Sequence, residues 1–150
     1  MPHSFVSILI HAVFSTKDRQ PTLSPELSGR LFPYIGGIVR ELHGTPLAVN
    51  GPIDHVHLLL SVPASVPVAD VLRVVKANSS RWVHEQLPRQ SNFAWQSGYA
   101  AFTVSASRLE QVRKYITLQQ EHHRFVSFQD EFLTLLNKHG IQYDARDLWG

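Results

Sequence analysis

The stretch LAVNGPIDHVHLLLSV, residues 47–62, has the pattern of two short strands joined by a tight turn. Asn50-Gly51 is a strong signal for a β-hairpin turn, and the residues after it are rich in branched apolar side chains. Because side chains alternate along a strand, His55 and His57 point to the same face, about 7 Å apart. The stretch therefore predicts a hairpin whose second strand carries two imidazoles side by side in an apolar setting.

Strand-like and helix-like patterns alternate on both sides of this hairpin. We predict strands at 5–15, 46–50, 53–62, 93–96 and 99–105, and helices at 25–44, 67–87, 108–123 and 128–138. The order β-α-β-β-α-β, with an additional strand and two additional helices, matches a ferredoxin-like split βαβ arrangement. We expect an α+β fold: an antiparallel sheet with helices on one face, plus a helix nearer the C-terminus that carries Tyr115. The other face or an edge would be free for dimerisation or a ligand.

Composition limits the class of protein. The chain has 150 residues, of which 43% are hydrophobic and 17% charged, and we expect one domain over 1–150. No run of about 18 apolar residues predicts a membrane span, and the start lacks the features of a secretory signal. The absence of cysteine excludes disulfides and thiolate metal sites and fits a cytoplasmic location. A net charge of +2 is too small to indicate a nucleic-acid partner by itself.

The pair His55-Val56-His57 has two interpretations. Nine histidines in the chain give the bare His-x-His pattern a high risk of coincidence. Two imidazoles on one strand face can converge on one metal ion or serve in catalysis, but they can also be hydrogen-bonded core residues. Residue patterns alone leave these alternatives open.

The segment VRKYITLQQEHHR, residues 112–124, is the second candidate. At helical spacing Tyr115, Gln119 and His122 lie on one stripe, which brings together a phenol, an amide and an imidazole. The alternative is an ordinary amphipathic helix with a partly exposed tyrosine and surface amides. The pair His122-His123 also suits the C-terminal end of a helix, where positive groups complement the dipole.

Five cations are candidates for contacts with nucleic-acid phosphates. They are Lys17, Arg19, Arg73, Lys76 and Arg81. Most such side chains are simply solvated, which is the alternative for each of them.

Six blocks, in this order, resemble the small single-tyrosine HUH transposases of the insertion-sequence-two-hundred type. They are HAVFSTKDR (11–19), DHVHLLLSVP (54–63), VVKANSS (74–80), WQSGYAAFTVS (95–105), YITLQQEHH (115–123) and LLNKHGIQYDARDLW (135–149). The blocks extend over nearly the whole chain, and their shared order is far more specific than any one of them.

The resemblance implies a function and a set of site residues. The histidine pair of the HUH motif falls on His55 and His57, the nucleophilic tyrosine on Tyr115, and a glutamine ligand on Gln119. The expected metal is Mg²⁺ or Mn²⁺, although imidazole also suits Zn²⁺. The expected reaction is cleavage and rejoining of single-stranded DNA at hairpin-bearing element ends, through a 5′-phosphotyrosine. The resemblance also implies a homodimer in which the tyrosine helix completes the partner's histidine pair in trans.

Two other functions remain open at this point. The chain could be a domesticated or inactive relative that binds hairpin DNA without cleaving it. It could also be a small metal-dependent hydrolase in which His122 or His123 replaces Gln119 as the third ligand. Resemblance to the transposases predicts that loss of Gln119 weakens metal binding more than loss of His122.

Overall fold

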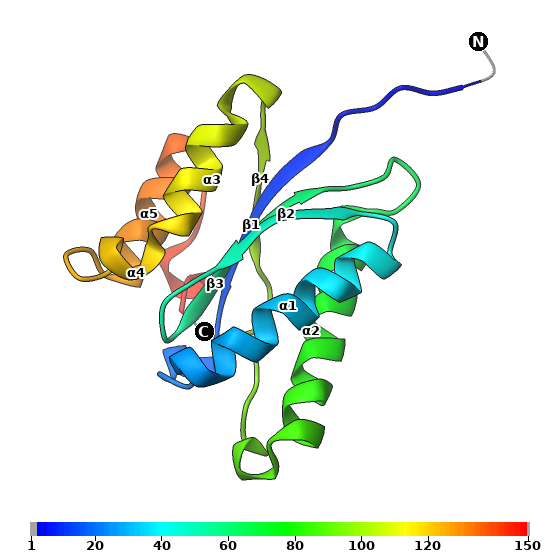
Figure 1. Ribbon diagram of the computed structural model, residues 1–150. Helices are drawn as coiled ribbons and strands as arrows, with labels where there is room; N and C mark the ends of the chain where they lie inside the picture. Colours follow the sequence, from blue (N-terminus) through cyan, green and yellow to red (C-terminus); the bar gives the residue numbers. More distant parts are fainter. Residues whose placement is uncertain (1–2, 150) are drawn as a thin grey trace.

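The computed structural model describes residues 3–149, which form a four-stranded antiparallel sheet covered by helices (Figure 1). The strands are β1 (Leu9–Ser15), β2 (Thr45–Asn50), β3 (His55–Ser61) and β4 (Ala100–Val104), in the order β2-β3-β1-β4. β3 is inserted between β1 and β2, the two strands that the first helix connects. This is the split βαβ arrangement, and it confirms the predicted α+β fold class.

Helices cover both faces of the sheet. On one face lie α1 (Pro25–Glu41) and α2 (Val68–Gln86); on the other lie α3 (Leu109–Thr117), α4 (Gln119–His122) and α5 (Phe128–Lys138) (Figure 1). The expectation that the second face stays free is therefore corrected. The physical reason lies in β1 and β3, which are buried along nearly their whole length and so need cover on both sides. None of the helices within 3–149 combines the length and the apolar character that a bilayer crossing requires.

Each face has its own apolar core. The first contains Val56, Leu58 and Leu60 of β3 together with the apolar stripes of α1 and α2. The second is smaller and is built from β1, β4 and α5, with Phe128 and Phe132 among its members. Because strand side chains alternate, the residues of β3 between those of the first core must point toward α3 to α5. The two histidines of β3 are among them.

Three elements differ most from the sequence prediction, while the others shift by at most three residues at their ends. Residues 5–8 precede β1, although the Val62 N–H donates to the Ile8 carbonyl oxygen over 2.9 Å; Pro63, the next residue, has no N–H to extend the pairing. The expected strand at 93–96 is reduced to one bridge between Thr16 and Trp95. The expected helix at 108–123 is interrupted at Leu118, whose ψ of 20° separates α3 from α4.

Candidate active site

β3 brings His55 and His57 together, as the sequence predicts, on the face covered by α3 to α5. Both side chains are completely buried. Their rings lie 5.2 Å apart between centroids. The first core packs on the opposite side of the strand, so the two imidazoles face only the smaller layer of helices. What they face there is a carboxylate.

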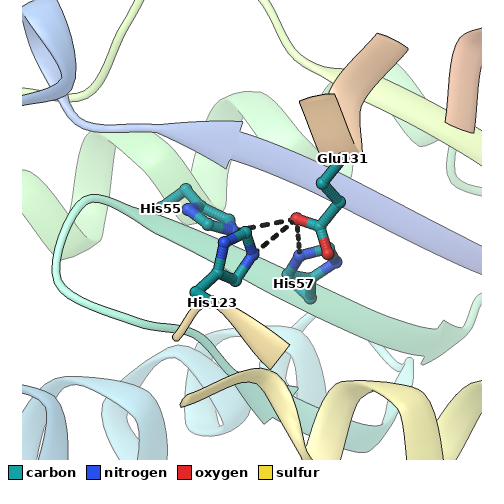
Figure 2. A group of neighbouring side chains, drawn as sticks. All are labelled: His55, His57, His123 and Glu131. Atoms are coloured by element: carbon teal, nitrogen blue, oxygen red, sulfur yellow. Dashed lines mark hydrogen bonds and ion pairs between the residues drawn. The ribbon is translucent and has the colours of Figure 1, made fainter. Parts of the chain in front are cut away.

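That carboxylate belongs to Glu131 on α5, which the sequence analysis did not identify. Its Oε1 lies 3.1 Å from His55 Nε2, 3.0 Å from His57 Nε2 and 2.9 Å from His123 Nε2 (Figure 2). Figure 2 shows the three rings, from β3 and from the end of α4, turned toward this one oxygen. We call these four residues the histidine–glutamate cluster.

The stripe of Tyr115, Gln119 and His122 reaches the other oxygen of the same carboxylate. The Tyr115 hydroxyl donates a hydrogen bond to Glu131 Oε2, and Gln119 Nε2 donates to it over 3.0 Å. His122 Nε2 lies 3.4 Å away. The structure therefore brings all four of the predicted central residues, on β3, α3 and α4, to one site.

These contacts are all made within one chain. Tyr115 lies against its own chain's His57, with 5.8 Å between ring centroids. The end of its helix is held by Asn50, whose side-chain amide donates to the carbonyl oxygens of Ile116 and Thr117. This is a placement in cis, and the exchange in trans that the resemblance implies requires a second chain.

Hydrogen bonds from the ring nitrogens that face away from Glu131 fix the orientation of two of the imidazoles. His123 Nδ1 lies 2.6 Å from the Val126 carbonyl oxygen, which can only accept, so this nitrogen carries a hydrogen. His55 Nδ1 donates in the same way to Asp54 over 2.8 Å. When these rings are neutral, each Nε2 presents a lone pair to the centre of the cluster. Donation from the outer nitrogen to a carboxylate or carbonyl is typical of metal-ligating histidines.

The surroundings set the charge of each group. Burial lowers the pKa of His57 to about 4 and that of His11, which lies 2.8 Å from His57 Nδ1, to about 3. Burial also acts to lower the pKa of His55, but hydrogen bonds to Asp54 and Glu131 outweigh it and raise that pKa. The contacts with histidines hold the pKa of Glu131 well below its usual range despite burial. At neutral pH the centre of the site therefore carries a buried carboxylate.

The residues of the site fit a divalent cation. One ligand atom from each member of the histidine–glutamate cluster lies within 4.8 Å of the others. Gln119 Oε1 is buried without a hydrogen-bond partner, although buried acceptors normally have one. Imidazole nitrogens suit Zn²⁺, and carboxylate oxygens suit Mg²⁺ and Mn²⁺. The donor set is consistent with any of these ions.

Among the residues that the sequence analysis missed, Glu131 left a signal in the sequence. Glu131 lies on the apolar stripe of α5, between Phe128 and Leu135, where a carboxylate is out of place unless it has buried partners. His11 lies on β1 beside the pair, but nothing in a single strand sequence indicates which strand becomes its neighbour. The position of His123 after α4 depends on the break at Leu118, which the helical pattern did not predict.

The predicted phosphate contacts are dispersed. They are Lys17 and Arg19 after β1, and Arg73, Lys76 and Arg81 on α2. The Arg19 guanidinium lies over the ring of Trp149, 5.2 Å from its centroid, and Lys76 donates to two backbone carbonyl oxygens. Because α2 covers the opposite face of the sheet, the structure does not bring its three cations to Tyr115 (Figure 1).

The known proteins that are similar to this chain are transposases. Residues 4–119 match the family described as "Transposase IS200 like". The ISDra2 transposase TnpA of Deinococcus radiodurans is 26% identical over 116 residues, which cover 74% of this chain and 83% of that protein.

Two solved structures share the fold. A candidate transposase from Deinococcus radiodurans R1 gives a TM-score of 0.66 at 23% identity, covering 80% of this chain and 96% of that chain. A REP-associated tyrosine transposase bound to a REP hairpin gives 0.62 at 15% identity, covering 84% of this chain and 74% of that chain.

Proposed function

The chain belongs to the IS200-like transposase family, and we propose that it cleaves and rejoins single-stranded DNA at the hairpin-bearing ends of a mobile element. In this proposal Tyr115 is the nucleophile, and a divalent ion is held by His55, His57 and Gln119. One observation carries it: the Tyr115 hydroxyl and three imidazole nitrogens meet at the same buried carboxylate.

The reaction can be written from these residues. The Tyr115 oxygen attacks phosphorus, and the bond from phosphorus to the 3′ oxygen of the preceding nucleotide breaks. The products are a 5′-phosphotyrosine and a strand that ends in a 3′-hydroxyl. Because the phosphodiester is retained as a covalent link, the 3′-hydroxyl of another strand can reverse the step. Rejoining therefore needs no nucleoside triphosphate.

Glu131 controls the proton of the nucleophile. Burial and the neighbouring carboxylate raise the pKa of Tyr115, so the phenol keeps its proton in the metal-free protein. Glu131 Oε2 accepts the hydrogen bond of this hydroxyl and so orients it, but the lowered pKa of Glu131 makes this carboxylate a weak base for the phenol proton. Over the whole step, the proton lost by the phenol is balanced by the proton that the leaving 3′ oxygen gains.

His55, His57 and Gln119 would hold the metal ion. His55 presents an Nε2 lone pair because its Nδ1 donates to Asp54, and Gln119 Oε1 has no other partner. When bound, a divalent ion supplies positive charge that polarises the phosphoryl oxygen and stabilises the phenolate. The neutral imidazoles and the amide offset none of that charge, whereas the Glu131 carboxylate beside them would offset part of it.

The substrate class rests on the family and on one neighbour. The REP-associated transposase that shares this fold is bound to a REP hairpin. We expect a single strand with a hairpin here as well, recognised by its folded shape, by stacking and by phosphate contacts. Lys17, Arg19 and the α2 cations Arg73, Lys76 and Arg81 remain predictions for contacts with DNA phosphates, and a homodimer remains a prediction for the assembly.

The test is a covalent-adduct assay with hairpin-bearing single strands and Mn²⁺. Because a 5′-phosphotyrosine retains the downstream DNA, a label at the 3′ end should stay with the protein after denaturation. A label at the 5′ end should appear only in a shortened free strand. Tyr115→Phe should abolish both signals.

Other outcomes identify the rival functions. Hairpin binding with no adduct under any of these conditions would indicate a relative that binds hairpin DNA without chemistry. Shortened strands without an adduct, unaffected by Tyr115→Phe, would indicate a hydrolase that activates water.

A further inference from the structure

A pocket of about 460 Å³ opens beside Tyr115. Its volume lies in the range of roughly 300–1,000 Å³ that is typical of ligand pockets. Helices α3 and α5 form its walls, and residues of β1 and β4, with His11 among them, form its floor. The pocket therefore adjoins both the proposed nucleophile and the histidine that contacts His57.

The walls of the pocket continue the helix faces that meet at the active site. Gln111 on α3 and Arg108, the residue before α3 begins, precede Tyr115 by four and seven residues and line the same pocket. On α5, Lys138 follows Glu131 by seven residues and lines the same pocket. Tyr115 contacts Glu131, and from this contact the two helices extend along the walls of the pocket. Arg108 and Lys138 each lie about two helical turns from the contact.

The lining is positive and partly apolar. Arg108 and Lys138 are exposed, and none of the lining residues in the described part of the chain is acidic. Arg108 donates to Gln111 over 2.8 Å, which holds its guanidinium at the wall. Val112 and Leu135 add apolar surface. Cations together with an apolar surface are the combination that binds single-stranded nucleic acid, through phosphates and bases.

We propose that this pocket binds the nucleotide of the single strand next to the scissile phosphate. A backbone phosphate lies between Arg108 and Lys138, and the base packs on Val112 and Leu135. The inference rests on the proposed function, in which Tyr115 attacks the neighbouring phosphate. It assigns substrate binding to α3 and α5, on the face opposite to the α2 cations.

The test measures binding separately from cleavage. Tyr115→Phe protein is titrated with fluorescently labelled dT20 in EDTA, and anisotropy is followed at several salt concentrations. Adding Arg108→Ala and Lys138→Ala should weaken binding at least about tenfold. It should also reduce the slope of log affinity against log salt by about 0.7, since the two side chains share one phosphate and each phosphate contact with a single strand contributes about 0.7.

The matched control removes one lysine and one arginine that do not line the pocket. Lys114→Ala with Arg89→Ala changes the net charge equally, and both side chains are exposed. It should leave the affinity within about twofold and the slope nearly unchanged. Equal losses in the two double variants, or no binding of dT20 at all, would overturn the proposal. Circular dichroism checks that each variant is folded.

This experiment can fail independently of the proposed function. If the wild type forms the adduct while the pocket variants bind dT20 normally, the pocket proposal falls and the transposase proposal stands. If the pocket variants lose binding while the wild type never forms an adduct, the pocket is supported and Tyr115 loses its assigned role.

Discussion

Glu131 is the residue on which the site depends, because one of its oxygens faces three imidazoles and the other accepts from Tyr115 and Gln119. A buried carboxylate in this position has two consequences. It stabilises the metal-free arrangement by accepting hydrogen bonds from Tyr115 and Gln119. It would also offer a bound cation an oxygen ligand beside the imidazole nitrogens.

The first prediction concerns which side chains hold the metal. Gln119→Ala should raise the Kd for Mn²⁺ about tenfold or more, because its amide contacts Glu131 at the site and its Oε1 has no other partner. His122→Ala should change it by less than about threefold, since His122 is partly exposed and lies 3.4 Å from the carboxylate. Calorimetric titration of the two variants gives the comparison. A larger loss for His122→Ala would favour the hydrolase.

A second prediction uses the pKa of His11, which burial lowers to about 3. An unfolded histidine has a pKa near 6.5, so at pH 5 the unfolded chain binds a proton at this position and the native protein does not. Stability therefore falls as the pH drops below about 6.5. Between pH 7 and 5 the metal-free wild type should lose about 2 kcal/mol more than His11→Gln. Urea unfolding at both pH values measures this, and equal losses would contradict it.

Among the elements, the end of α3 determines whether Tyr115 serves its own chain. Asn50, at the end of β2, donates to the Ile116 and Thr117 carbonyl oxygens, and Gln120 donates to Asn50 and Gly51. Carbonyl groups at a helix end need such partners, and here the β2–β3 turn provides them. The hairpin that carries the histidines thus also anchors the tyrosine helix.

The third prediction tests this anchor. Asn50→Ala should lower the free energy of unfolding by about 1–3 kcal/mol, because it leaves carbonyl groups of α3 without partners. It should also speed amide hydrogen exchange in α3 and α4 more than in α1. Asn137→Ala removes an exposed amide from α5 and should stay within about 0.5 kcal/mol of the wild type. Equal effects of the two changes would mean that Asn50 is not an anchor.

The sequence predicted only those parts of the site that follow from local periodicity within one strand or one helix. Alternation along β3 paired His55 with His57, and the helical repeat aligned Tyr115 with Gln119, because both patterns involve neighbours in the chain. Glu131 contacts His57 across 74 residues, and no local pattern indicates that α5 packs on that face. The same limitation explains why the second layer of helices was not expected.

For the molecule as a whole, the central question is whether one chain or two make an active site. In the structure Tyr115 meets the histidines of its own chain. The fourth prediction follows from this placement in cis. A mixture of Tyr115→Phe and His57→Ala proteins should form no more covalent adduct than either variant alone. Recovery of adduct in the mixture, with wild type as the positive control, would show that the tyrosine helix acts in trans.

The most direct test of the central claim is to identify the residue that becomes attached to DNA. Wild-type protein is incubated with a hairpin-bearing single strand and Mn²⁺, digested with nuclease and protease, and analysed by mass spectrometry. We predict a peptide in which Tyr115 carries a 5′-linked nucleotide phosphate, and its absence from Tyr115→Phe protein. A nucleotide found on any other residue, or adduct of equal yield from Tyr115→Phe, would contradict the assignment of Tyr115 as the nucleophile.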